Sequence, residues 1–275
     1  MHSISKKKFN LWGGGFQHSS SSTLYKIPNN IIWDYNSFLN EETFYVDDSI
    51  IKVFDDNFSK IKYGWLLESK YITPNIEEYC HKTYPELKKY FKYIFTHNKN
   101  LIKIDKNFFK FAPANGTWIS NPYISNKNKL ISMITSNKSE TEGHKKRLEI
   151  AKMFYNNLDL YGRGFNEIQK KEEGLEEYMF SICIENGMYE TYFTEKILDC
   201  FAVGTIPIYL GTPDIFDYFN KDGIILLDQN FSINKLSIEL YESKKNAIID
   251  NFERVKKYNT AEDWIYENYF KELKT

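Results

Sequence analysis

The sequence is short of cysteine, of net charge and of long apolar runs, and each shortage excludes a class of protein. Cys80, Cys183 and Cys200 are the only 3 cysteines among 275 residues, and their spacing fits neither a disulfide framework nor a Cys/His metal site. We therefore expect buried, reduced thiols of the kind found in cytoplasmic proteins. The formal net charge of −1 gives no overall field that would attract nucleic acid.

Apolar runs long enough to span a bilayer are also missing. None approaches the roughly 20 residues that a membrane-spanning helix needs. The N-terminus, MHSISKKKFN, is basic, but no apolar segment of a secretory signal peptide follows it. We expect a soluble, cytoplasmic protein without a transmembrane segment, and peripheral association with a membrane stays open.

The first half of the chain predicts short strands around one helix. With 42% hydrophobic and 17% aromatic residues, the composition is that of a globular protein. Strand candidates are residues 30–33, 43–46, 63–67, 93–96 and 108–111, and residues 76–91 predict a helix that Pro85 should kink or split. The glycine- and serine-rich segment 13–22 reads as a loop. Residues 114–128, rich in Asn, Gly, Pro and Ser, are the best candidate for a linker.

The second half begins a new α/β pattern. Residues 130–134 predict a buried strand, and residues 144–157 predict a helix with Leu148, Ala151, Tyr155 and Leu158 along one face. Residues 158–161 predict a strand that the turn Gly162-Arg163-Gly164 ends. Residues 178–211 supply a second strand–helix–strand unit, 223–227 a further strand, and the tail from 233 is helical. We expect an N-terminal domain at 1–125, a ligand-binding domain at 126–245, and helices at 246–275 that pack back on the N-terminal domain.

Polar side chains gather in one turn of the second unit. Glu185, Asn186, Tyr192, Glu195 and Lys196 lie between the apolar strand 180–184 and the start of the next helix. Ligands of parallel α/β sheets bind at the carboxyl ends of the strands, where helix N-termini favour phosphate. The pattern therefore predicts a nucleotide site at this turn.

Three segments of the second half share a larger pattern. Residues 184–211 contain, in order, the end of a strand, a Glu-Asn pair, a helix that starts with Tyr-x-Thr-Glu-Lys, and a strand that starts with Gly-Thr-x-Pro. Two further segments, ISMITSNKSETEGHKKRLEIA and LDLYGRG, precede them in the chain. Together these segments resemble glycosyltransferase family 10, the α-1,3/4-fucosyltransferases, over about residues 60–230. The resemblance implies an α/β protein of the GT-B class, with two Rossmann-like domains facing across a cleft, and inverting transfer from a nucleotide sugar, GDP-fucose in the type members, to a saccharide acceptor.

The resemblance also implies roles for the polar residues of the second half. Lys196 and Arg147 would neutralise the diphosphate as it leaves. Glu195 would accept hydrogen bonds from ribose hydroxyls, Tyr192 would contact the nucleoside, and Asn186, next to Glu185, would orient the sugar or phosphate. Each role has a plainer alternative, because Glu195-Lys196 suits any exposed helix start, Arg147 lies in a Lys-Lys-Arg run, and Tyr192 suits core packing.

The general base would come from the first half. Glu68 fits best, because it follows an apolar strand, where partial burial would raise its pKa. His97 follows another strand and is a second candidate for the base or for acceptor contact, although a structural role is the plainer interpretation. Arg163 lies either over the cleft or merely in a tight turn that requires positive φ.

No cofactor or metal is expected. The sequence lacks Asp-x-Asp, the usual ligand pattern of metal-dependent GT-A transferases, and we interpret Asp47-Asp48 and Asp55-Asp56 as loop or surface charge. Two hypotheses compete with fucosyl transfer: the same fold using another nucleotide sugar, and a sugar- or nucleotide-binding protein without catalysis.

Overall fold

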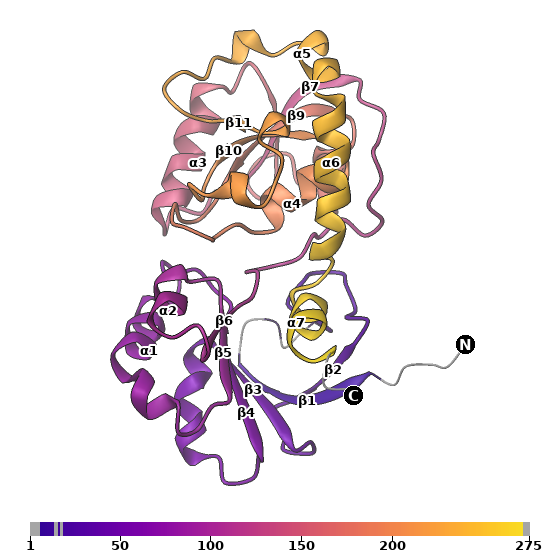
Figure 1. Ribbon diagram of the computed structural model, residues 1–275. Coiled ribbons are helices and arrows are strands. Elements are labelled where there is room, and N and C mark those ends of the chain that lie inside the picture. Colours follow the sequence, from indigo (N-terminus) through magenta and orange to yellow (C-terminus); the bar gives the residue numbers. More distant parts are fainter. Residues whose placement is uncertain (1–5, 14–15, 17–18, 272–275) are drawn as a thin grey trace, which may run out of the picture. The chain divides into compact units, whose positions relative to one another are not determined.

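The chain folds into two α/β units in the computed structural model, which describes residues 6–13, 16 and 19–271 (Figure 1). One unit holds the described residues up to Gly116 together with those from Asn259 onward, and the other runs from Thr117 to Tyr258. The first break falls inside the predicted linker, at a different position from the predicted boundary. The basic start of the chain and part of the segment 13–22, namely residues 1–5, 14–15 and 17–18, lie outside the described residues.

The first unit is built on a parallel sheet of 6 strands in the order β2-β1-β3-β4-β5-β6. The strands are β1 (Lys7–Trp12), β2 (Ile31–Tyr35), β3 (Glu42–Val46), β4 (Ile61–Leu66), β5 (Tyr93–Thr96) and β6 (Phe109–Phe111). The sequence patterns predict all of them except β1. A run of lysines and the polar Asn10 hide that strand, yet Asn10 is fully buried and donates to the Asn40 carbonyl at 2.7 Å and to Thr43 Oγ1 at 2.9 Å.

Alternate residues of these strands feed two apolar layers, as the period of a strand requires. One layer contains Tyr45 and Ile94 and packs against α1 (Pro74–Leu87), α2 (Lys99–Ile104) and the 3-10 helix Asp47–Asp55. The other contains Phe44 and Phe95 and packs against α7 (Ala261–Tyr269), whose Tyr266 is buried there with the following Phe270. Pro85 does not split α1, which continues through it to Leu87.

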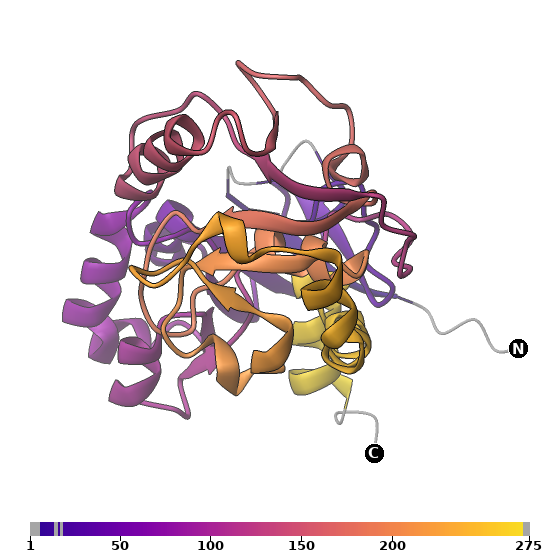
Figure 2. The ribbon, with the colours of Figure 1, turned by 90° about the horizontal axis from the view of Figure 1, so that it is seen from above.

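The second unit has a parallel sheet of 5 strands in the order β11-β10-β9-β7-β8. Its elements are β7 (Lys129–Ile134), α3 (Glu142–Met153), β8 (Asp159–Tyr161), β9 (Tyr178–Ile184), α4 (Glu195–Ala202), β10 (Ile206–Leu210), β11 (Ile225–Leu226), α5 (Ile238–Ser243) and α6 (Lys245–Val255). The strand order reverses between β7 and β9, and this switch point is where doubly wound sheets bind their ligands. Figures 1 and 2 both show α3 on one side of the sheet and α6 on the other.

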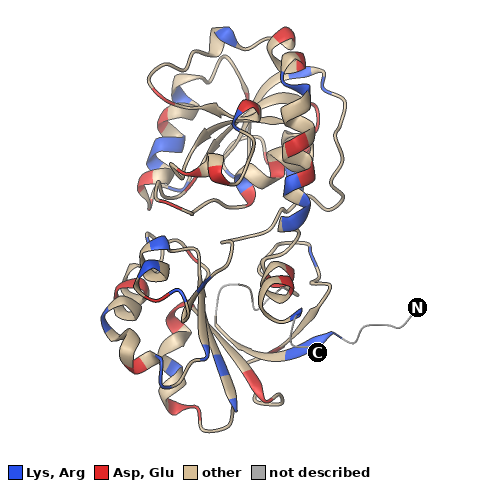
Figure 3. Ribbon diagram, in the orientation of Figure 1, with Lys and Arg blue, Asp and Glu red and all other residues tan. Residues whose placement is uncertain are grey.

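The helices of the second unit differ from prediction in two respects. The buried face of α3 holds Gly143, Arg147, Ile150 and Ala151, whereas the predicted face residue Tyr155 is exposed and lies beyond the helix. α6 belongs to the second unit, where it packs against α4, although residues from 246 onward were predicted to pack on the first domain. Both α3 and α6 carry basic as well as acidic residues (Figure 3). None of the described helices is long and apolar enough to cross a membrane.

Candidate functional site

The turn between β9 and α4 is built around a buried carboxylate. Glu185 follows β9 directly, is fully buried, and accepts hydrogen bonds from the backbone N–H of Thr194 at 2.9 Å and from its hydroxyl at 2.7 Å. Thr194 is the N-cap of α4, so Glu185 fixes the start of that helix. Burial raises the pKa of Glu185, and the nearby Lys196 partly offsets this effect.

Lys196 lies in the first turn of α4 among acceptors. Its Nζ is 3.0 Å from Thr194 Oγ1, 3.2 Å from Glu195 Oε1 and 3.6 Å from Glu185 Oε2. Burial disfavours the charged amine, but the two carboxylates outweigh it and raise the pKa of Lys196. Burial also opposes ionisation of Glu195, yet Lys196 and Lys171 lower its pKa. Both groups are therefore charged at neutral pH, and the Lys196 side chain is still 19% exposed.

Arg147 reaches the same place from α3. Its Nη2 donates to Asn186 Oδ1 at 2.5 Å, and its Nε donates to the Gly143 carbonyl at 3.3 Å. A side chain at Gly143 would place its Cβ 2.3 Å from the Glu185 carbonyl oxygen, so only glycine lets α3 approach the turn this closely. Burial lowers the pKa of Arg147, and the negative charges of Glu185 and Glu195 partly offset this effect.

The structure brings five of the predicted donor-site residues into one cluster. Arg147 also depresses the pKa of Lys196, which shows that the two cations act on each other. The members, called the switch-point cluster below, are Arg147, Glu185, Asn186, Glu195 and Lys196. A buried guanidinium and a partly buried ammonium group, the latter paired with two carboxylates, are suited to bind a diphosphate at the end of β9.

The other two predicted residues of this unit are Tyr192 and Arg163. Tyr192 is buried and stacks on Tyr189 with ring centroids 4.7 Å apart. Arg163 is exposed between Gly162 and Gly164, whose φ angles are 110° and 86°. A Cβ at Gly162 would lie 1.9 Å from the Thr135 carbonyl oxygen, so the tight-turn interpretation fits this segment.

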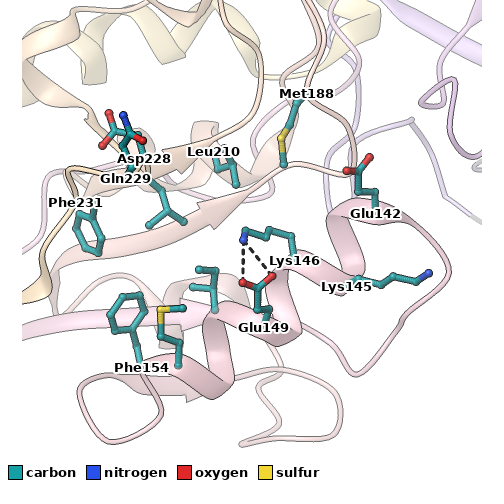
Figure 4. Close-up of a pocket in the computed structure, with 13 residues that line it drawn as sticks. Glu142, Lys145, Lys146, Glu149, Phe154, Met188, Leu210, Asp228, Gln229 and Phe231 are labelled. Atoms are coloured by element: carbon teal, nitrogen blue, oxygen red, sulfur yellow. Dashed lines mark hydrogen bonds and ion pairs between the residues drawn. The ribbon is translucent and has the colours of Figure 1, made fainter.

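A pocket of about 700 Å³ opens beside α3 at the ends of β10 and β11 (Figure 4). Apolar side chains such as Met188 and Leu210 line it, and Lys146 and Glu149 form an ion pair at 3.0 Å along its α3 side. None of the residues predicted for the donor site lines this pocket.

The predicted base residues lie in the first unit, at the carboxyl ends of neighbouring strands. Glu68 follows β4 and is exposed, so the predicted partial burial is wrong: it lies two residues beyond the strand, in the loop. His97 follows β5 and is buried, and its Nε2 lies 3.2 Å from the Glu68 carbonyl oxygen. Burial lowers the pKa of His97 to about 4, which favours a neutral, structural imidazole.

One member of each aspartate pair is buried, so surface charge is the wrong interpretation for Asp47 and Asp56, although Asp56 lies in a loop as predicted. Asp47 is buried and accepts from the backbone N–H groups of Leu67 and Glu68. Asp56 is buried and accepts from Tyr45 Oη at 2.7 Å. Sequence reasoning missed Asp47 because an acidic pair after a strand resembles a solvated turn. Within the described ranges, no three His, Cys, Asp or Glu side chains are grouped as metal ligands would be.

Comparisons with known proteins identify the family of the chain. A family model described as glycosyltransferase family 10 (fucosyltransferase) C-term matches residues 124–271. The α-(1,3)-fucosyltransferase FucT of Helicobacter pylori is 36% identical over 89 residues, which are 32% of this chain and 18% of that protein. The GDP-fucose protein O-fucosyltransferase 3 of Gallus gallus is 34% identical over 58 residues, which are 21% of this chain and 12% of that protein. The matched segments thus span under a fifth of these two relatives.

Solved structures resemble the whole fold. A crystal structure of an α1,3-fucosyltransferase with GDP aligns with a TM-score of 0.53 at 17% identity, covering 92% of this chain and 83% of that one. Two parallel α/β units with a charged switch point thus define a protein of the GT-B class, which confirms the predicted fold class. Because the family model covers more than half of the sequence, the chain belongs to glycosyltransferase family 10 (fucosyltransferase).

Proposed function

We propose that the protein transfers fucose from GDP-fucose to a hydroxyl group of a saccharide, with inversion at the anomeric carbon. The observation that carries the proposal is the convergence of Arg147 and Lys196 on the end of β9, within a chain that belongs to a fucosyltransferase family. The names of the relatives and of the solved structure with GDP support fucose and guanosine diphosphate as the donor's parts.

The switch-point cluster binds the donor in this proposal. Arg147 and Lys196 hold the diphosphate and stabilise the charge that develops on it as the sugar leaves. Glu195 accepts from the ribose hydroxyls, Asn186 orients the phosphate or sugar while it holds Arg147, and Tyr192 packs beside the nucleoside. Glu185 does not contact the donor in this proposal but holds Thr194 and Lys196 in place, since its carboxylate accepts hydrogen bonds from Thr194 and pairs with Lys196. Arg163, in its exposed turn, is a secondary candidate for contact with the acceptor.

Glu68 is the general base of the proposed reaction. The acceptor oxygen attacks the anomeric carbon from the side opposite the diphosphate, so that one C–O bond forms as the bond to the β-phosphate oxygen breaks. The electron pair of the broken bond leaves with GDP, and the acceptor proton passes to the Glu68 carboxylate. No metal or cofactor takes part in this scheme.

A pocket in the first unit supports a saccharide acceptor. It has a volume of about 420 Å³, and its lining includes the polar side chains of Lys70, Glu77 and Asn98. Lys70 and Asn98 closely follow Glu68 and His97 in sequence. Carboxylate, amide and ammonium groups in this number are suited to bind the hydroxyls of a sugar. The three cysteines are free and buried, which supports the predicted cytoplasmic location.

Transfer is tested by incubating the purified chain with radiolabelled GDP-fucose and N-acetyllactosamine, and by titrating GDP, UDP and CDP calorimetrically. We expect labelled trisaccharide and a preference for GDP. If the chain binds UDP or CDP but not GDP, and transfers a sugar from the corresponding nucleotide sugar, the assignment of GDP-fucose as the donor is wrong. If the chain binds GDP and the Glu68→Ala variant turns over at the parent rate, the assignment of Glu68 as the base is wrong. If the chain binds GDP but shows no turnover at all, a binding protein without catalysis is favoured.

The similarity to a protein O-fucosyltransferase makes a protein hydroxyl the second acceptor class. A folded protein domain with exposed Ser and Thr, offered beside the saccharide, separates the two. Label on the protein alone would replace the saccharide acceptor and leave the donor half of the proposal intact.

A further inference from the structure

The peptide groups on both sides of Glu68 are held by residues from the two neighbouring strands. Asp47 follows β3 and accepts through Oδ1 from the N–H of Leu67 at 2.8 Å and from the N–H of Glu68 at 3.2 Å. His97 follows β5, and its Nε2 lies 3.2 Å from the Glu68 carbonyl oxygen. As a neutral imidazole protonated at Nε2, His97 donates to that carbonyl. β3, β4 and β5 are adjacent in the sheet, so the three residues lie at one edge.

Holding Glu68 in this way is costly for Asp47. Its φ is 48°, in the left-handed region that residues other than glycine seldom adopt. It is also buried, and that burial raises its pKa to about 7 despite two favourable backbone hydrogen bonds. Strain and burial at one residue that touches a candidate catalytic group indicate a functional constraint.

Asp56 shows what a purely structural aspartate looks like in the same unit. It is as buried as Asp47, and its partners are Tyr45 on β3, Lys62 on β4 at 3.7 Å, and the backbone N–H groups of Phe58 and Ser59 in its own turn. Its hydrogen bonds outweigh burial, so its pKa is lowered. Asp56 therefore links its own loop to β3 and β4, and none of these contacts involves Glu68, whereas Asp47 accepts from the backbone N–H of Glu68.

We propose that Asp47 and His97 are positioning residues that clamp the backbone of Glu68 and aim its exposed carboxylate at the acceptor hydroxyl. The inference rests on the proposed role of Glu68 as the base. An exposed side chain in a loop has many rotamers and backbone states, and a displacement of about 1 Å from the reactive geometry can lower a rate about 100-fold. Fixing both peptide groups removes the backbone part of that freedom.

The clamp needs an acceptor at residue 47 and a donor at residue 97. Asp47→Asn keeps the acceptor oxygen and His97→Gln keeps an N–H group near Nε2, whereas Asp47→Ala and His97→Ala remove them. We expect both alanine variants to lower kcat roughly 10- to 100-fold, with the donor KM and the GDP affinity unchanged. Asp47→Asn and His97→Gln should recover most of the turnover.

Double variants separate positioning from general damage. In a Glu68→Gln background, Asp47→Ala should cause no further loss of kcat, because a residue that acts through Glu68 has nothing left to position. Asp56→Asn is the matched control: it should lower the urea midpoint without lowering kcat. Should Asp47→Ala fail to fold, the comparison of His97→Ala with His97→Gln carries the same test.

Failure of the clamp and failure of the base give different results. If Glu68→Gln lowers kcat sharply to a residual, measurable rate while both alanine variants keep the parent kcat, the clamp is overturned and the base stands. The clamp is also overturned if Asp56→Asn lowers kcat as far as Asp47→Ala at equal stability. If Glu68→Gln itself turns over normally, the assignment of the base is wrong and the inference is overturned with it.

Discussion

The Arg147 guanidinium donates through Nη2 to Asn186 Oδ1 at 2.5 Å, linking α3 to the residue that follows the buried Glu185. The bond joins the two segments that diverge from the switch point of the second sheet. It also explains why an arginine in a Lys-Lys-Arg run is buried while its neighbour Lys145 is exposed.

Replacing Arg147 with glutamine should weaken GDP binding more than it weakens folding. The variant loses a charge-assisted contact with the diphosphate worth roughly 1.5–3 kcal/mol, so GDP affinity should fall about 10- to 150-fold. Calorimetric titration measures this directly. Lys146→Ala, which removes the neighbouring lysine paired with Glu149, should bind GDP like the parent. Equal losses in both variants would mean that Arg147 contributes only to the general charge of α3.

Lys196→Met should affect both turnover and stability. The loss of one preorganised cation at the leaving group typically lowers kcat about 100- to 1000-fold. The carboxylates of Glu185 and Glu195 would also lose the cation that they share, so the midpoint of thermal unfolding should fall. Single-turnover kinetics and calorimetry measure the two effects. A variant that is destabilised but turns over at the parent rate would contradict the role at the leaving group.

Asp199→Asn should stabilise the protein near neutral pH. Asp199 is buried, Oδ1 accepts from Thr117 and Trp118, and within the described residues Oδ2 has no hydrogen-bond partner. Burial raises its pKa from 3.8 to about 7, so its contribution to stability is fully present below pH 3.8 and is lost as the pH rises through 7.

Asparagine keeps the accepting oxygen without that loss, so the variant should gain at least about 1 kcal/mol at pH 7 over the parent. The gain should shrink toward zero as the pH falls to 4. Urea unfolding of both proteins across this range is the measurement. A constant difference at every pH would show that Asp199 does not titrate as described.

Gly143→Ala should disturb the site through the backbone. The new Cβ would meet the Glu185 carbonyl oxygen at 2.3 Å, so α3 must move away from the turn and take Arg147 with it. We expect a lower unfolding midpoint together with weaker GDP binding. Glu149→Ala, on the exposed side of α3, provides the control for changes in the helix itself. If Gly143→Ala binds GDP with unchanged affinity, the close packing of α3 against the turn does not contribute to donor binding.

The sequence patterns predicted most elements of this fold because buried parallel strands read as short apolar runs. β5 was predicted at its observed bounds, and the turn after β9 was recognised from Glu185, Asn186 and Lys196 together. β1 was missed because the hydrogen-bond partners of the buried Asn10 side chain are Asn40 and Thr43, which lie 30 and 33 positions further along the chain. No local sequence pattern reveals partners at that distance. Asp47 was missed for the same reason, since its partners follow a different strand. Thr194 could have been found, because Thr-Glu-Lys before an apolar run is a common helix start.

The second unit is an insertion within the first, and this fixes the order in which the two can be completed during synthesis. Translation finishes Thr117–Tyr258 before Tyr266 and Phe270 of the last helical segment leave the ribosome. Until Phe270 has been made, Phe9 and Phe44 have only the apolar neighbours that the N-terminal segment itself supplies, such as Trp33 and Tyr63. The second unit can therefore fold on a nascent chain before the core of the first unit is complete.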